Sequence, residues 1–249
     1  MSKRLKLVVS YDGAPFAGWQ SQTNGNAVQD HLERAFAVVT GAQVRVHGAG
    51  RTDAGVHALA QTAHADLPDQ SLTAAQWPSA LNASLVPAIR VLRSQYVPLE
   101  FHARFSARGK LYRYRIWNDR ILPPFEVGRA WLVAAPLDFP AMVKEAQTFV
   151  GRHDFASFAA NRGHRERETT RTIEAVRVRR KGKCLTIEVA GDGFLYKMVR
   201  LMVGALVRRG RGQAPNDEIK QRLLRPSQAP AGSRMVAPAA GLFLVRVRY

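Results

Sequence analysis

The chain has 249 residues, 46% of them hydrophobic, and this composition excludes a disordered protein because it supplies enough apolar side chains for a packed core. Lys and Arg total 37 against 19 Asp and Glu, so the formal net charge is +18, which favours a polyanionic partner, nucleic acid ahead of an anionic membrane. The single cysteine, Cys184, excludes an intrachain disulfide and a cysteine-based zinc cluster, and it favours the cytoplasm. Lys6 interrupts the only short apolar stretch near the N-terminus, which argues against a signal peptide, and no uncharged run is long enough to span a bilayer.

The first half of the chain predicts alternating strands and helices. Leu5, Leu7 and Val9 alternate as in a half-buried strand. Asn26 suits a helix N-cap, with Gln29 completing a capping box and Gly41 ending the helix. One face of that helix would be apolar, formed by Val28, Leu32, Ala35, Phe36 and Val39. Further strands are expected at residues 44–46, 58–66 and 89–96, and a second helix at about 73–83.

The second half predicts a similar order. Residues 111–117 alternate as a strand, and Asp138 caps a helix that Gly151 terminates. The apolar side of that helix would hold Phe139, Met142, Val143, Ala146 and Phe149. Residues 172–179 and 184–189 suggest a hairpin around Gly182, followed by a helix at about 194–209 and a closing strand at 242–247.

These elements predict an α+β protein made of two tandem βαββαβ units, similar to ferredoxin or RRM domains, each with an antiparallel sheet covered by helices. We place the boundary near Phe105, which gives an N-terminal unit of residues 1–105 and a C-terminal unit of residues 106–249. Residues 159–170 are polar and rich in arginine, and we expect them to form a mobile basic loop.

The glycine-flanked segment at residues 48–58 carries the most chemical information. It fits neither the dinucleotide-binding fingerprint, which needs glycine where Asp53 stands, nor the Walker phosphate loop. A lone Asp in a loop is commonly an Asx-turn that bonds its own backbone. Arg51 lies two residues away, however, and a nearby guanidinium would keep the Asp53 carboxylate ionised and ready as a nucleophile.

A metal site is the competing interpretation of this region. His57, His64 and Asp66 could be two histidines and a carboxylate that bind a metal ion. Neither HxH nor HxxxH spacing occurs, and His64 lies in an ordinary alternating strand, so structural roles for the histidines are favoured.

Two further segments allow both a binding and a packing role. In the strand at residues 111–116, Tyr112, Tyr114 and Ile116 share one face, and Leu111, Arg113 and Arg115 share the other. Such a strand could stack RNA bases and meet phosphates, or it could place its tyrosines in the core. In the later helix, Met198, Met202 and Val203 form a core stripe, Arg200 lies off it as a solvated or a functional arginine, and Gly204 would leave space beside Arg200. Cys184 is expected to be a buried core thiol.

Several of these motifs together resemble the tRNA pseudouridine synthase A (TruA) family. The matching segments are YDGAPFAGWQ at residues 11–20, Val28 and Gln29, GRTDAGVHA at 50–58, YRYRI at 112–116, RTI at 171–173, the helix around Arg200 with Val203 and Gly204, and Gly241 and Leu242. They occur in the family's order over nearly the whole chain, and the GRTDAGVHA string is highly specific. Ala27 departs from the expected Thr, at a position that touches the first helix only.

The resemblance implies that the chain converts uridine to pseudouridine in tRNA without a metal or cofactor. It implies Asp53 as the catalytic aspartate, Tyr112 as the active-site tyrosine, and Arg200 as the basic partner of Asp53. Arg51 would hold the target nucleotide out of the stack. The resemblance also implies a homodimer with tRNA in a basic cleft, and targets on the 3′ side of the anticodon stem-loop.

Two other functions stay open from the residues alone. A non-catalytic RNA-binding protein of two RRM-like units would share the charge, the aromatic strand and the fold, but it has no use for a carboxylate in a basic cleft. A metal-dependent hydrolase would need a site such as that of His57, His64 and Asp66.

Overall fold

The computed structural model describes residues 3–23, 25–68, 72–160, 168–226 and 235–249. The chain divides into two units, the first formed by Met1–Arg108 with Phe243–Tyr249 and the second by Gly109–Leu242. The first unit therefore extends past the expected boundary near Phe105, and it includes Phe243–Tyr249, which cover most of the strand predicted at residues 242–247.

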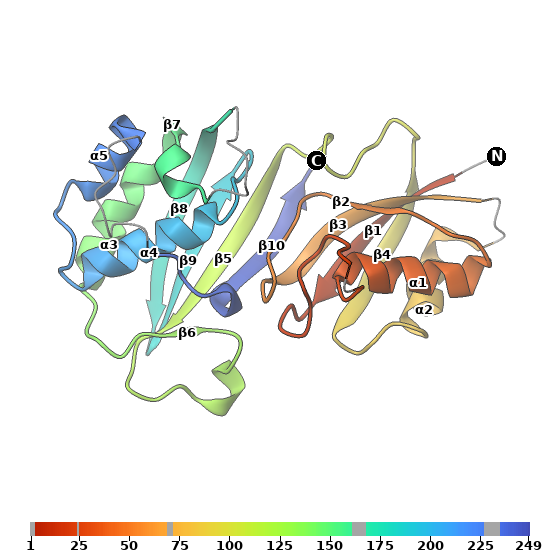
Figure 1. The fold of residues 1–249 in the computed structure, drawn as a ribbon, viewed down its shortest axis with the longest axis horizontal. Helices are drawn as coiled ribbons and strands as arrows, with labels where there is room; N and C mark the ends of the chain where they lie inside the picture. The colour runs from red at the N-terminus through yellow and green to blue at the C-terminus, as the bar shows by residue number, and fades with distance from the viewer. Residues whose placement is uncertain (1–2, 24, 69–71, 161–167, 227–234) are drawn as a thin grey trace. The chain divides into compact units, whose positions relative to one another are not determined.

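The sheet of the first unit has the strand order β4–β1–β3–β10, with β2 also pairing with β3. Its strands are β1 (Lys3–Tyr11), β2 (Val46–Gly48), β3 (His57–Leu67), β4 (Ile89–Val97) and β10 (Leu242–Arg248). All these pairs are antiparallel except β3 with β10. Helices α1 (Val28–Thr40) and α2 (Trp77–Asn82) of this unit lie on one face of the sheet (Figure 1). Leu5, Leu7 and Val9 of β1 are fully buried, as their alternation predicts.

Both helices of the first unit begin later than the sequence indicates. The N-cap of α1 is Ala27, whose N–H donates to the Asp30 carboxylate at 2.8 Å, so the prediction of Asn26 and Gln29 as the cap is wrong. Gly41 does end α1, at a φ of 70°. Residues 74–76 form a 3₁₀ turn, and α2 starts only at Trp77. Pro78 explains this, because a proline inside a longer helix would lack an N–H and collide with the preceding turn.

The sheet of the second unit has the antiparallel order β5–β9–β8–β7, with β6 parallel to β5. Its strands are β5 (Gly109–Trp117), β6 (Trp131–Leu132), β7 (Gly151–Asp154), β8 (Thr170–Lys181) and β9 (Cys184–Gly191). Its helices are α3 (Phe139–Ala146), α4 (Met198–Gly210) and α5 (Glu218–Leu224), and α3 and α4 lie on the same face of the sheet (Figure 1).

Local sequence signals account for most of the second unit. Asp138 caps α3 by accepting the Ala141 N–H at 2.9 Å, and Gly182, at a φ of 58°, makes the turn of the β8–β9 hairpin. The helix predicted at residues 194–209 begins only at Met198, because Lys197 before it has a left-handed backbone with φ 58° and ψ 11°. Cys184 is partly exposed on β9, so the prediction of a buried thiol is wrong.

The predicted α+β class is confirmed, and the first unit follows the βαββαβ order. The second unit departs from that order because it adds β6, β7 and α5. The final strand β10 pairs in parallel with β3, with Phe243 opposite His57 and Leu244 opposite Ala58. None of the helices in the described part of the chain is long and apolar enough to cross a membrane.

Candidate active site

The loop between β2 and β3 presents Arg51 and Asp53 on either side of an inward-pointing residue. Arg51 is exposed, Thr52 is buried at 6% exposure, and Asp53 is half-buried. The Val56 N–H donates to the Asp53 carbonyl at 3.1 Å, and Gly55 has a φ of 76°, so a tight turn follows the aspartate directly. The loop thus offers a carboxylate and a guanidinium at the surface while the residue between them is anchored.

Hydrogen bonds from two strands and from the segment after β1 hold this loop. The Tyr11 hydroxyl lies 2.9 Å from Oγ1 of Thr52, and the Trp19 N–H donates to the Thr52 carbonyl at 3.1 Å. The Gln61 side chain, fully buried, donates from Nε2 to the Gly50 carbonyl at 2.9 Å. These contacts are made by neutral, buried groups, which set the loop conformation without adding charge near Asp53.

Glycines let the segment at residues 11–20 pack directly on the loop. A Cβ at Gly18 would lie 2.6 Å from the Thr52 carbonyl oxygen, and one at Gly13 would lie 2.0 Å from the Val56 carbonyl oxygen. Gly18 also has a φ of 98°. Sequence reasoning from the residues missed the supporting role of this segment. The only indication of this role in the sequence was the high density of glycine and aromatic residues. The family resemblance matched these residues as one continuous segment.

The histidines of the alternative metal site serve as hydrogen-bond acceptors in the first unit. His57 Nδ1 accepts the Gly13 N–H at 3.0 Å, and His64 Nδ1 accepts the Ala103 N–H at 3.1 Å. Asp66 is held by Arg4, whose Nε donates to it at 2.6 Å. Within the described residues, no three His, Cys, Asp or Glu side chains are grouped as metal ligands. This geometry favours structural roles for the two histidines.

Tyr112 lies on the inner face of β5, at 8% exposure. Its ring meets that of Phe194 edge to face, with 5.0 Å between the ring centroids. Tyr114 is fully buried, and its hydroxyl donates to the Pro238 carbonyl at 2.8 Å. The tyrosine face of the strand therefore packs into its unit, and Tyr112, at the start of the strand, is the less buried of these two tyrosines.

The arginines on the other face of β5 are already paired with carboxylates. Arg113 Nη2 lies 2.8 Å from Glu188, and Arg115 Nη2 lies 2.6 Å from Glu126. A phosphate would have to compete with these glutamates for the guanidinium groups. This arrangement argues against β5 as an RNA-stacking surface with free arginines.

Arg200 is half-buried on α4 and is held by main-chain contacts. Its Nε donates to the Ala237 carbonyl at 2.7 Å, so Arg200 is not a freely solvated helix arginine. The expectation of open space at Gly204 is wrong, because a Cβ there would lie 1.8 Å from the Met235 carbonyl oxygen. Gly204 therefore allows the segment at residues 235–237 to lie directly on α4, beside Arg200.

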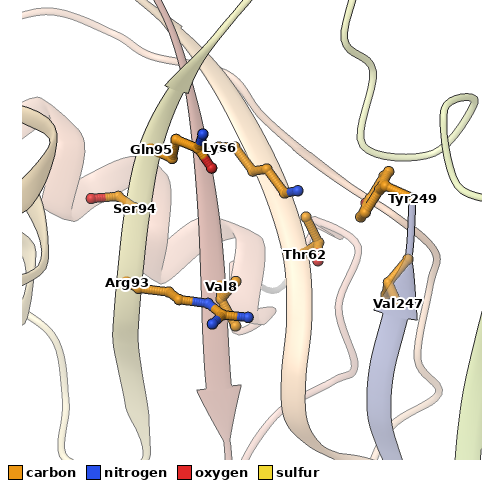
Figure 2. Close-up of a pocket in the computed structure, with 8 residues that line it drawn as sticks. All are labelled: Lys6, Val8, Thr62, Arg93, Ser94, Gln95, Val247 and Tyr249. Carbon is orange, nitrogen blue, oxygen red and sulfur yellow. The ribbon is translucent and has the colours of Figure 1, made fainter.

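A pocket of about 220 Å³ opens on the first unit's sheet (Figure 2). The Lys6 ammonium lies 4.2 Å from the centroid of the Tyr249 ring and 5.0 Å from that of Phe101. Burial lowers the pKa of Lys6, and the charge of nearby Arg93 lowers it further. Thr62 lines the pocket, whereas its neighbour Gln61 points to the Asp53 loop, so the pocket lies on the opposite face of β3 from that loop.

The structure brings Arg51 and Asp53 together on one loop of the first unit, and it places Tyr112 and Arg200 in the second unit. Most of the arginine-rich loop expected at residues 159–170 falls on residues 161–167, which lie outside the described residues.

Comparisons with known proteins agree with the motifs. A family model described as tRNA pseudouridine synthase matches residues 7–106 and 146–249. The tRNA pseudouridine synthase A of Akkermansia muciniphila is 46% identical over 252 residues, covering 99% of this chain and 95% of that protein. The protein of the same name from Afipia carboxidovorans is 45% identical, with 99% of each chain covered, and that from Acetivibrio thermocellus is 41% identical, with 99% and 100% covered.

The family model covers well over half of the chain, and the relatives match it almost from end to end. The motif GRTDAGVHA, on which the resemblance mainly depended, lies inside the first matched range. The chain therefore belongs to the tRNA pseudouridine synthase family of isomerases.

Proposed function

We propose that the chain converts uridines on the 3′ side of the anticodon stem-loop of tRNA to pseudouridine, with Asp53 as the nucleophile. The observation that carries this proposal is the anchored loop, in which buried contacts hold Thr52 while Asp53 and Arg51 reach the surface. The names of the relatives support tRNA as the substrate, and the family resemblance supports the position of the target uridines.

The reaction rearranges one nucleotide and needs no outside group. The bond between N1 of uracil and C1′ of ribose breaks, and a bond between C5 and C1′ forms. The proton on C5 is removed, and N1 gains one, so no atom or electron is gained or lost overall. An ionised carboxylate can add covalently to the pyrimidine ring or to the sugar and leave again, which keeps the detached base in the site.

Three further residues would complete the substrate-binding site in this proposal. Arg51, exposed beside Asp53, would occupy the space that the flipped uridine leaves in the stack. Tyr112 would stack on the base or assist removal of the C5 proton. Arg200 would be the basic partner of the Asp53 carboxylate. The family resemblance further supports a homodimer, which sedimentation of the purified protein would test.

The experiment is pseudouridine mapping in unmodified tRNA after incubation with Asp53→Asn. The matched control is Asp66→Asn, which removes a carboxylate of the same unit that is bound to Arg4. We expect Asp53→Asn to abolish pseudouridine formation and to keep tRNA affinity, and we expect Asp66→Asn to retain the wild-type rate. An active Asp53→Asn would overturn the nucleophile assignment.

The alternative functions give different results in the same assay. A non-catalytic RNA-binding protein would form no pseudouridine with any variant. A metal-dependent enzyme would lose activity on dialysis against EDTA and recover it with one specific divalent ion. Attack by a carboxylate needs no Lewis acid, so we expect activity to survive that dialysis.

A further inference from the structure

Thr52 is the fixed point of the Asp53 loop. Its side chain and its main-chain carbonyl are both engaged, the first with Tyr11 at 2.9 Å and the second with the Trp19 N–H at 3.1 Å. On either side of it in the chain, Arg51 is exposed and Asp53 is half-buried. Since Thr52 points inward, its contacts decide how far its two neighbours, Arg51 and Asp53, reach outward.

Tyr11 is itself held by the sheet. It is the last residue of β1, at 4% exposure, and it pairs with Ala58 of β3 and Ile89 of β4. Its ring contacts that of Trp19, with 6.1 Å between the ring centroids. The position of the Tyr11 hydroxyl is therefore set by main-chain pairing on both sides of β1, which makes it a rigid support.

The protonation state of the Tyr11 hydroxyl favours a role in positioning the loop over a role in proton transfer. Burial raises the pKa of the phenol, and the hydrogen bonds with Thr52 and Gln61 only partly oppose that shift. The hydroxyl consequently stays neutral throughout the physiological range and keeps its hydrogen bond.

We propose that Tyr11 is a positioning residue of the reaction: through its hydroxyl it holds Thr52, and through Thr52 it sets the position of the Asp53 carboxylate and of Arg51. The contact joins residues 41 positions apart, neither of which is the proposed nucleophile. This inference rests on the proposed function, because it assumes that the Asp53 carboxylate attacks the nucleotide.

The test is the single-turnover rate of pseudouridine formation by Tyr11→Phe, which removes only the hydroxyl. The matched control is Tyr96→Phe, because the Tyr96 hydroxyl is also internal to the first unit, donating to the Leu72 carbonyl at 2.7 Å and accepting from Trp77 Nε1 at 3.0 Å. We expect Tyr11→Phe to slow the rate by about tenfold to a hundredfold, since small displacements of a reacting group have effects of that size. The Kd for tRNA should change by less than about twofold, and the control should retain the wild-type rate.

Two variants of Thr52 separate positioning from folding. Thr52→Val removes the same hydrogen bond and should lower the rate as Tyr11→Phe does, whereas Thr52→Ser retains a hydroxyl and should be faster than Thr52→Val. The double variant Tyr11→Phe/Thr52→Val should be no slower than Tyr11→Phe, because the contact between the two residues can be lost only once. Rates are measured on the folded fraction, determined by circular dichroism and thermal unfolding.

Each outcome decides the matter. Wild-type turnover per folded molecule in both Tyr11→Phe and Thr52→Val overturns the positioning role. A loss that appears in the Kd for tRNA instead of the rate also overturns it. An active Asp53→Asn overturns the proposed function itself, whereas an inactive Asp53→Asn with a fully active Tyr11→Phe overturns only this inference.

Discussion

Arg200 and Ala237 are joined by two hydrogen bonds in opposite directions. Arg200 Nε donates to the Ala237 carbonyl at 2.7 Å, and the Ala237 N–H donates to the Arg200 carbonyl at 3.1 Å. The first bond uses one edge of the guanidinium group and fixes the plane in which its remaining N–H groups lie. The side chain is thus oriented by a segment that Gly204 allows to approach α4 closely.

Arg200→Lys should lower turnover at least tenfold and change tRNA affinity little. An ammonium keeps the charge but cannot bond the Ala237 carbonyl through Nε and present a planar fork at the same time. The control is Arg208→Lys on the same helix, where Arg208 Nη2 lies 3.2 Å from Glu218. Single-turnover rates with saturating enzyme measure the effect, and equal rates for both variants would remove Arg200 from the site.

Arg51→Ala should slow turnover most on tRNA whose target uridine is paired and stacked. Flipping such a nucleotide costs a few kcal/mol, and an inserted side chain offsets part of that. A target uridine that is already unpaired has less stacking and pairing energy to lose, so Arg51→Ala should recover part of its rate on such a substrate. The rate of Asp53→Ala should not increase on either substrate. Equal losses on both substrates would mean that Arg51 serves the chemistry or the fold instead of base flipping.

Local patterns predicted most elements of the fold, because alternation and capping act over a few residues. Leu5, Leu7 and Val9 revealed β1, and Asp138 revealed the start of α3. The prediction failed where a single residue overrode the pattern, as Pro78 does in the second helix. The parallel pairing of β10 with β3 was not predicted, because alternation identifies a strand but not the strands with which it pairs.

The candidate site was predicted mainly through family resemblance. The residues themselves indicated Asp53 and Arg51, because a carboxylate in a glycine-flanked loop of a basic protein, with an arginine two residues away, is typical of a nucleophile kept ionised. For Tyr112 and Arg200, the residues alone did not distinguish a role in packing from a role in the reaction. The contact of Tyr11 with Thr52 had no local signal at all, since only the pairing of β1 with β3 brings the two residues together.

The stability of the protein should fall as the pH drops below about 6.5, partly because of His64. Burial, and then the charges of His102, Arg4 and His47, lower the pKa of His64 to about 4 in the folded state. The unfolded chain takes up this proton near pH 6.5 and the folded chain only near pH 4, so stability present above pH 6.5 is lost between these values.

Urea unfolding at pH 7, 6 and 5 would measure this effect. One such group changes the free energy of unfolding by at most about 1.4 kcal/mol per pH unit. His64→Asn, whose Oδ1 can still accept the Ala103 N–H, should show a shallower dependence on pH than the wild type. If the stability of His64→Asn depended on pH as steeply as that of the wild type, the loss of stability would come from other titrating groups.

Binding of tRNA should weaken steeply as salt is added. If about six phosphates are neutralised, a tenfold rise in salt should lower the affinity by about four to five orders of magnitude. Reversing the charges of Arg162 and Arg165, in the arginine-rich loop predicted from sequence, should flatten that dependence. Reversal of Lys220, exposed on α5, is the control, and a shallow dependence in the wild type would contradict a basic binding cleft.

The pairing of β10 with β3 constrains the order in which the chain can fold. As synthesis proceeds from the N-terminus, residues 1–108 emerge before Phe243–Tyr249, yet these last residues complete the sheet of the same unit. Until then the His57 end of β3 lacks its β10 neighbour, and an open strand edge can pair with another chain. The second unit is in effect an insertion in the first, so we expect expression of residues 1–108 alone to give an aggregation-prone product that a supplied β10 segment would protect.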